Sequence, residues 1–278
     1  MADIWLDVTG ASDFAASPLD IAILENDRAT ISLVREALQK RRVMLAYQPV
    51  MRGNDLTQVA FHEGLVRLTD ETGRVIPARD FMATVETTEI GRLIDCAALE
   101  LGLETLRREP AIRLSINMSA RSIGYPRWTE ILRHGLAADD TAGERLILEI
   151  TESSAMLMPE IVTTFMAELQ RKGISFALDD FGSGYTAFRY FREFFFDIVK
   201  IDGQFIRGVA RDPDSQVLTQ ALLMIARQFD MFAVAEEVET PEDAAWLQEQ
   251  GVDFLQGYLF GLPTTTPVWS DVAARQSA

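Results

Sequence analysis

Residues 159–180 read PEIVTTFMAELQRKGISFALDD, and the order of patterns in this stretch indicates the fold. A helical pattern starts at Pro159, which suits a first turn, and ends at Gly173, which suits a helix C-terminus. An apolar segment follows directly and ends in two adjacent carboxylates, Asp179 and Asp180. A helix that leads into a buried strand is the repeating unit of parallel sheets covered by helices.

The same alternation extends in both directions along the chain. Eight short apolar segments are strand candidates, at residues 43–50, 58–66, 112–119, 145–151, 174–180, 197–202, 231–237 and 254–259. Amphipathic helical stretches lie between them, at residues 95–109, 159–173, 215–229 and 240–251. This count favours a (β/α)8 TIM-type barrel over an open doubly wound sheet. The gap between the first two segments is too short for a helix, so we expect an antiparallel hairpin there, with the second segment as the antiparallel strand.

The ends of the chain do not continue the barrel pattern. Residues 1–27 are acidic with little periodicity, and they predict a tail or a linker remnant. We expect the barrel to occupy residues 28–270, beginning with a helix over residues 28–42, and residues 271–278 to form a C-terminal tail.

Composition excludes several classes of protein. A formal net charge of −16 makes the chain a poor binder of nucleic-acid polymers, which need a basic face. Cys96 is the one cysteine, so no internal disulfide can form, as is usual in a reducing compartment. No apolar run approaches the roughly 18 residues that span a membrane, and the N-terminus lacks the features of a signal peptide. We therefore expect a cytoplasmic protein without a membrane span.

Polar residues gather where the strand candidates end. Barrel enzymes build their active sites from the C-terminal ends of the strands. Those ends carry, together with Glu63 from the second segment, the residues Asn117, Glu152, Asp179, Asp180, Lys200, Asp202, Glu236 and Gln256. Any one alone would be read as a solvated charge, but their convergence on one rim indicates a site. Crowded carboxylates with an amide oxygen and no paired His or Cys favour Mg²⁺ or Mn²⁺ over Zn²⁺. Two such ions are a common arrangement for phosphodiester hydrolysis.

These residues, in this order, resemble the EAL domain of bacterial cyclic-di-GMP phosphodiesterases. The matching motifs are YQP (47–49), EGLVR (63–67), NMS (117–119), EITES (149–153), DDFGSGY (179–185), KID (200–202), AEEVE (235–239) and QGYLF (256–260). Eight motifs in order over a barrel pattern are highly specific, and the resemblance covers residues 28–267. It implies a barrel with one antiparallel strand, and a reaction that opens cyclic di-GMP to linear pGpG.

The resemblance also implies roles for individual residues. Of two Mg²⁺ or Mn²⁺ ions, the first would be held by Glu63, Asn117, Glu152 and Asp179, and the second by Asp179, Asp180 and Glu236. Lys200, Asp180 and Glu236 would form the catalytic set, in which Lys200 contacts the attacking water. Residues in contact with the substrate or its waters would be Gln48, Arg67, Asp202 and Gln256, although Arg67 is also explained by a rim salt bridge and Asp202 by support of Lys200. Loop support would come from Glu239, Gly182 and Gly184.

The chain departs from the family pattern at three places. Gly64 replaces an Ala, the loop after Asp180 continues with Tyr185-Thr186-Ala187-Phe188, and Glu237 stands where the family usually has Gly. A Glu is strained wherever the backbone needs a conformation that only Gly adopts easily. The alternative function is therefore a catalytically weak or inactive domain that acts as a cyclic-di-GMP receptor or protein-interaction module. A third is an unrelated two-metal phosphatase on a similar barrel.

The remaining predictions concern partners and three single residues. An aromatic run, residues 188–196, indicates either a homodimer surface or a barrel–helix core, and the resemblance adds an upstream sensory or GGDEF-type domain as a further partner. We expect His62 to be a packing residue, because strand alternation points it away from Glu63. We expect His134 at the surface and Cys96 in the core.

Overall fold

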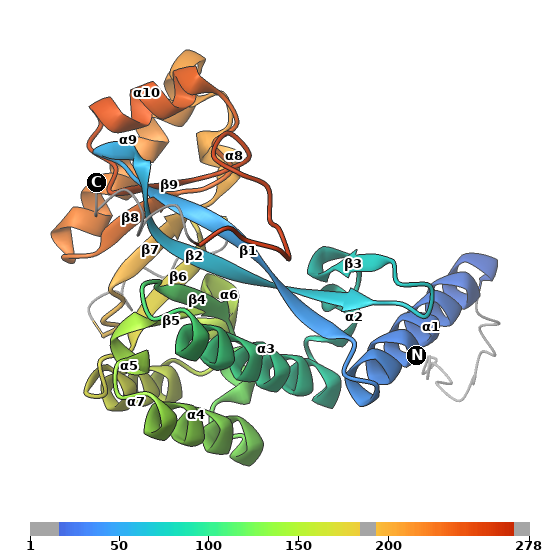
Figure 1. The fold of residues 1–278 in the computed structure, drawn as a ribbon. Helices are drawn as coiled ribbons and strands as arrows, with labels where there is room; N and C mark the ends of the chain where they lie inside the picture. The colour runs from blue at the N-terminus through green and yellow to red at the C-terminus, as the bar shows by residue number, and fades with distance from the viewer. Residues whose placement is uncertain (1–16, 184–192, 270–278) are drawn as a thin grey trace, which may run out of the picture.

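The computed structural model describes residues 17–183 and 193–269. Eight strands close into a barrel: β1 (Val43–Arg52), β2 (Asp55–Thr69), β4 (Leu114–Asn117), β5 (Leu146–Thr151), β6 (Ser175–Phe181), β7 (Ile198–Ile201), β8 (Phe232–Ala235) and β9 (Phe254–Gln256). Each strand pairs with the next in this order, and β9 pairs with β1. A short strand, β3 (Val75–Pro77), extends the sheet at the far end of β2. The predicted eight-stranded barrel is confirmed (Figure 1).

The antiparallel strand of the barrel is β1. It runs antiparallel to both of its neighbours, β2 and β9, whereas β2 runs parallel to β4. The predicted hairpin is confirmed, but the prediction that its second strand is the antiparallel one is wrong. A short turn reverses the chain after β1, so one hairpin strand must oppose the rest of the barrel. Because β2 is joined to β4 through a covering helix, β2 takes the common direction and β1 does not.

The longer helices lie outside the barrel (Figure 1). They are α1 (Pro18–Gln39), α3 (Glu89–Arg108), α4 (Pro126–Ala138), α7 (Pro159–Gln170), α9 (Pro213–Gln228) and α10 (Pro241–Glu249). Single turns are α2 (Met82–Val85), α5 (Ala142–Arg145), α6 (Glu152–Ala155), α8 (Gly203–Ile206), η1 (Ala78–Asp80), η2 (Ala120–Ser122) and η4 (Val209–Arg211). In the described ranges, no helix combines the length and the apolar character that crossing a membrane requires.

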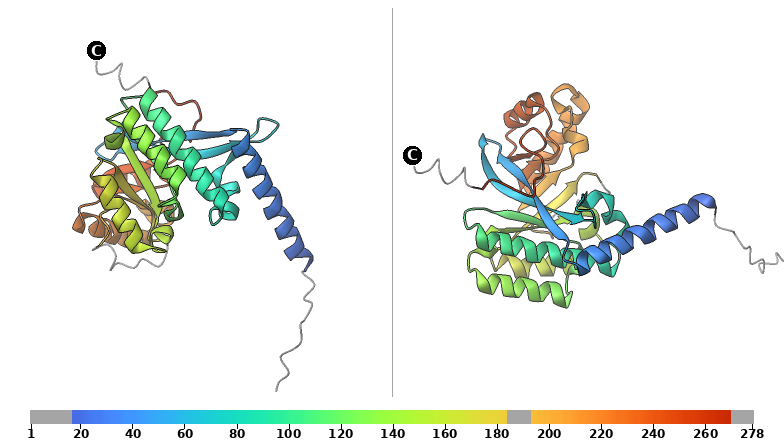
Figure 2. Two further views of the ribbon diagram at one scale, coloured as in Figure 1. Left: turned by 90° about the horizontal axis from the view of Figure 1, so that it is seen from below. Right: turned by 45° about the vertical axis from the view of Figure 1, so that its right-hand side comes forward.

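The first helix, α1, begins earlier than predicted. It starts at Pro18, inside the range expected to be a tail, whereas the sequence predicted a helix over residues 28–42. Val34 and Ala37 near its end are buried, while Ala22 and Leu24 are exposed. Both views in Figure 2 show its N-terminal half projecting from the barrel. Because the N-terminal half of α1 does not pack against the barrel, it needs no apolar face. The apolar periodicity from which helices are predicted is therefore missing there.

An apolar layer fills the barrel toward the end where the parallel strands begin. Its members are Val50, Phe61, Ile147, Ala177, Ile198 and Val234, with Phe254 packed against them. Side chains alternate between the two faces of a strand, so the residue two positions along each strand also points into the barrel. Those next positions hold the polar residues of the candidate site.

Candidate metal centre at the C-terminal end of the barrel

A ring of eight polar residues, one from each barrel strand or its end, lies above the apolar layer. We call it the polar ring, and it consists of Gln48, Glu63, Asn117, Glu149, Asp179, Lys200, Glu236 and Gln256. Each lies two positions from the inward residue of the layer below, with Ser115 as that residue in β4. In the antiparallel strand β1 the order is inverted, so Gln48 precedes Val50.

Lys200 lies at the centre of the polar ring. Its Nζ is 2.8 Å from Glu149 Oε2, 2.9 Å from Glu236 Oε1, 3.0 Å from Asp179 Oδ1 and 3.5 Å from Glu63 Oε2. Burial alone would lower the pKa of Lys200, but the surrounding carboxylates outweigh it and raise that pKa well above its usual range. Lys200 therefore remains a cation and a hydrogen-bond donor.

Glu149, and not Glu152, is the β5 carboxylate in the ring. Glu149 is fully buried and lies beside Asn117 in the strand register. Glu152 lies past the end of β5, where its Oε2 accepts a hydrogen bond from the backbone N–H of Gly182 at 3.3 Å. The sequence singled out Glu152 as a metal ligand, whereas in the structure Glu149 occupies the polar ring and Glu152 supports the loop at Gly182. Glu149 lies two positions from Ile147 on the same face of β5, so it can be identified once the inward face of the strand is known.

Two amide side chains orient Glu63. Asn117 Nδ2 donates to Glu63 Oε1 at 2.8 Å, and Gln256 Nε2 donates to Glu63 Oε2 at 2.6 Å and to Gln48 Oε1 at 3.3 Å. Burial would raise the pKa of Glu63, but Lys200 and these two amides outweigh it and lower that pKa. Glu63 is thus held ionised, with its two oxygens in fixed positions.

A second group of carboxylates lies at the open side of the ring. Single oxygens of Asp179, Asp180 and Glu236 lie within 4.8 Å of one another. Burial and the neighbouring Asp179 raise the pKa of Asp180 to about 6. Burial is also the main cause that raises the pKa of Glu236 well above its usual range. The backbone of Asp180 has a φ of 58°, a left-handed conformation that is unusual for a residue other than Gly and is common at functional sites.

The chemistry of the donors fits a divalent cation that prefers oxygen ligands. Five carboxylates crowd around one lysine: Glu63, Glu149, Asp179, Asp180 and Glu236. Within the described residues, Glu149 Oε1 and Gln256 Oε1 are buried without a hydrogen-bond partner. An unpaired buried oxygen costs free energy, and a cation at this position would remove that cost.

Other predicted site residues have local roles in the structure. Arg67 Nη1 donates to the carbonyl oxygen of its neighbour Val66 at 2.9 Å, and no rim salt bridge of Arg67 is found in the described ranges. Asp202 caps α8 by accepting the backbone N–H of Gln204 at 2.7 Å. Glu239 is exposed. Gly184 lies outside the described residues, as does the loop 185–188.

Glu237 points away from the polar ring. Its backbone has a φ of 54°, so the position does require the conformation that favours Gly. Its Oε2 lies 2.8 Å from Arg207 Nη1, and both side chains are about half exposed. The side chain lies against Gly203, where an added Cβ would meet Glu237 Oε2. The unusual carboxylate therefore adds strain but does not enter the site.

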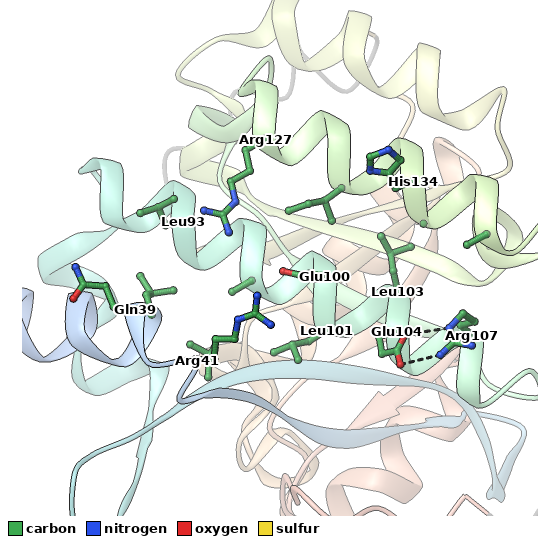
Figure 3. A pocket seen from close by; sticks show the side chains of 16 residues that line it. Gln39, Arg41, Leu93, Glu100, Leu101, Leu103, Glu104, Arg107, Arg127 and His134 are labelled. Carbon is green, nitrogen blue, oxygen red and sulfur yellow. Dashed lines mark hydrogen bonds and ion pairs between the residues drawn. The ribbon is translucent and has the colours of Figure 1, made fainter.

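The three residues expected to have no catalytic role are placed as predicted. The His62 ring packs edge-on against Trp269 with centroids 4.7 Å apart, and burial lowers the pKa of His62 to about 4. Cys96 is buried, and burial raises the pKa of its thiol to about 11. His134 is exposed beside a cavity of about 720 Å³ between α1, α3 and α4 (Figure 3). No member of the polar ring lines this cavity, which lies on the outer side of the barrel.

Comparison with protein families and curated proteins gives consistent matches. A family model described as "EAL domain" matches residues 32–263. The chain is 30% identical over 246 residues to the cyclic di-GMP phosphodiesterase PdeF of Escherichia coli (strain K12), which covers 86% of this chain and 32% of PdeF. It is 29% identical over 235 residues to the cyclic di-GMP phosphodiesterase NbdA of Pseudomonas aeruginosa, covering 83% of this chain and 30% of NbdA. The chain thus spans about a third of the length of these relatives.

Solved structures with the same fold include complexes with the dinucleotide. The PaMucR phosphodiesterase in its c-di-GMP complex aligns with a TM-score of 0.73 and 28% identity, over 85% of this chain and 97% of that one. The FimX EAL domain of Xanthomonas citri, also in complex with c-diGMP, aligns with a TM-score of 0.78 and 24% identity, over 90% of this chain and 100% of that one. The second match bears on the fold alone.

Proposed function

The chain belongs to the EAL domain family, and from that premise we propose that it hydrolyses cyclic di-GMP to linear pGpG with the help of divalent metal ions. The observation that carries the proposal is the complete polar ring, in which Lys200 is surrounded by carboxylates at the active end of the barrel. The residues at which this chain departs from the family pattern do not include Lys200, Asp180 or Glu236, which were predicted to act in catalysis.

Two ions, Mg²⁺ or Mn²⁺, account for the arrangement of the oxygen donors. We assign one ion to Glu63, Asn117, Glu149 and Asp179, and the other to Asp179, Asp180 and Glu236. When bound, such a pair supplies positive charge for a phosphodiester and a more acidic water. Asp179 lies between the two groups, which suits it to serve both.

The roles of the protein's own cations follow from their charge states. The carboxylates around Lys200 favour its charged form, which suits it to orient the attacking water or a phosphate oxygen through its N–H groups. The guanidinium of Arg67 is suited to a bidentate contact with a phosphate of the substrate. Gln48, the member of the polar ring that accepts a hydrogen bond from Gln256 Nε2, is suited to a polar contact with the substrate.

A product assay tests the proposal. The protein is incubated with cyclic di-GMP and either Mg²⁺ or Mn²⁺, and products are separated by chromatography. We expect pGpG, and we expect neither EDTA-treated protein nor the Asp179→Asn variant to form it. Protein that binds the nucleotide but forms no product with either metal would refute the proposal.

The strain at Glu237 favours one second candidate, a cyclic-di-GMP receptor with weak or no turnover. Glu237 directly follows Glu236 and has a left-handed backbone conformation. Strain in that backbone would shift the Glu236 carboxylate from the position in which it holds a metal ion. Tight nucleotide binding in EDTA without turnover would support the receptor. The family match argues against the third reading, an unrelated phosphatase on a similar barrel.

The proposed partners beyond the nucleotide stay predictions. The homodimer was predicted from an aromatic run that falls partly in residues 184–192, outside the described residues. An upstream sensory or GGDEF-type domain is compatible with the greater length of the curated relatives.

A further inference from the structure

A buried carboxylate outside the polar ring holds the turn that follows Asn117. Asp95 on α3 is 3% exposed. Its Oδ2 accepts the backbone N–H of Ser119 at 3.0 Å and the hydroxyl of Ser122 at 2.6 Å. Both donors belong to the turn directly after β4, which contains η2. One oxygen atom thus fastens both ends of this turn to a helix outside the barrel.

The same turn is bonded to the next loop of the barrel rim. The backbone N–H of Ala120 donates to Ser154 Oγ at 2.8 Å. Ser154 belongs to α6, whose first residue Glu152 accepts the backbone N–H of Gly182. A line of hydrogen bonds therefore connects Asp95 through two turns to the segment that follows β6.

The position of Asn117 depends on this turn. Asn117 is the last residue of β4, and its short side chain must direct Nδ2 to Glu63 Oε1 at 2.8 Å. Ligand groups in such sites need placement within about 0.5 Å. Beyond Asn117 the strand ends, so Ser119 and Ser122, held by Asp95, determine where the chain goes next.

The burial of the Asp95 carboxylate costs free energy, which the hydrogen bonds that hold the turn after β4 must offset. Within the described residues it forms no ion pair, and burial raises its pKa to about 7. A buried carboxylate that lacks a cation destabilises the fold unless its hydrogen bonds compensate. The two hydrogen bonds from the η2 turn, one from a backbone N–H and one from a hydroxyl, are the interactions that its side chain makes.

We propose that Asp95 is a positioning residue of the metal centre, which fixes Asn117 by holding the turn after β4. This inference rests on the proposed function, because it assumes that Asn117 is a ligand. Residues that orient metal ligands typically change metal affinity or activity by about 10- to 100-fold when they are mutated.

The chain offers a matched control for the test. Asp243 on α10 is also 3% exposed, and it accepts the backbone N–H groups of Gly208 and Ala210 and the hydroxyl of Thr240. The turn that it holds carries no residue of the polar ring. Asp243→Ala therefore measures what the loss of a buried, turn-holding aspartate does by itself.

The test measures Mn²⁺ affinity of the full chain by electron paramagnetic resonance, after removal of metal, for wild type, Asp95→Ala, Asp95→Asn and Asp243→Ala. We expect Asp95→Ala to bind Mn²⁺ about 10- to 100-fold more weakly and Asp243→Ala to bind within about twofold of wild type. Asp95→Asn, which keeps an acceptor oxygen, should recover most of the affinity. Hydrogen exchange in residues 117–122 should speed up in Asp95→Ala only.

Folded Asp95→Ala with wild-type Mn²⁺ affinity would overturn the inference, because a purely structural role predicts that result. If Asp95→Ala does not fold, Ser122→Ala removes one of the two bonds, and unchanged Mn²⁺ affinity in that variant overturns the inference equally. The proposed function fails separately, when wild type binds Mn²⁺ but does not hydrolyse cyclic di-GMP.

Discussion

Lys200 and Glu149 meet at 2.8 Å inside the barrel, where their side chains are 1% and 0% exposed. Both charged side chains have been removed from water. Their mutual attraction offsets a desolvation cost that would destabilise either charge if it were buried without a partner. Three further carboxylates lie within 3.5 Å of the same lysine nitrogen. The stability and the chemistry of this end of the barrel therefore both depend on how the positive charge of Lys200 offsets the surrounding carboxylates.

Replacement of Lys200 by Met removes the cation at a similar side-chain length. We expect the metal-free variant to lose roughly 3–5 kcal/mol of unfolding free energy, because the buried carboxylates lose their partner. Mg²⁺ should restore part of this loss, since it supplies positive charge to the same oxygens. Turnover should fall by at least about 100-fold. Urea unfolding with EDTA and with Mg²⁺ measures the first two effects, and a product assay measures the third.

The control for this variant is Lys172→Met. Lys172 pairs with Glu168 at 3.2 Å on the surface, where both side chains are about half exposed. An exposed pair contributes little, so we expect a change below about 0.5 kcal/mol. If Lys200→Met and Lys172→Met unfold at the same urea concentration, the buried ion pairs of Lys200 do not stabilise the fold.

Glu149→Gln and Glu152→Gln together test the reassignment on β5. Each replaces a carboxylate by an amide of almost the same shape. We expect Glu149→Gln to weaken Mn²⁺ binding by more than about tenfold, because a ring carboxylate is lost. Glu152→Gln keeps a carbonyl oxygen for the Gly182 N–H, so its Mn²⁺ affinity should stay within about threefold of wild type. The reverse order of effects, measured by Mn²⁺ titration, would restore the sequence-based assignment.

Glu237→Gly should stabilise the protein. The left-handed backbone costs a residue with a Cβ about 1–2 kcal/mol, and Gly relieves this strain. Part of the relief is offset by the greater conformational freedom of Gly in the unfolded chain. We expect a net gain of roughly 0.5–1 kcal/mol in urea unfolding. Arg207→Ala is the control for the lost ion pair, which is exposed and should contribute little. A less stable Glu237→Gly variant would show that contacts of the Glu237 side chain stabilise the fold by more than the backbone strain destabilises it.

The buried Asp95 predicts a pH dependence of stability. Its pKa is raised from 3.8 to about 7 by burial, so the folded state holds a proton that the unfolded state releases at lower pH. Wild type therefore loses this contribution as pH rises from about 4 through 7, whereas Asp95→Asn has no such group. The unfolding free energy of Asp95→Asn relative to wild type should rise by roughly 3 kcal/mol between about pH 5 and pH 8, at about 1.4 kcal/mol per pKa unit. A difference that does not change with pH would contradict the assignment.

Local patterns in the sequence were enough to predict the barrel and most residues of the polar ring. Alternation of apolar segments with helical stretches is a local pattern, and it predicted eight strands at the places where the structure has them. Pro159 and Gly173 marked the ends of α7 because first turns and left-handed caps have strong residue preferences. Lys200 and Asp179 were found because the strands of such a barrel direct their C-terminal ends to one rim.

Choices that depend on closure of the barrel could not be made from the sequence. Whether β1 or β2 opposes the other strands follows from pairing with β4 and β9, which are distant in sequence. Whether Glu149 or Glu152 faces Lys200 follows from the register of β5, since one position along a strand turns a side chain to the other face. The role of Asp95 depends on a contact between α3 and a turn 24 residues away. Sequence periodicity tells which residues are buried, but packing between distant segments decides what they face.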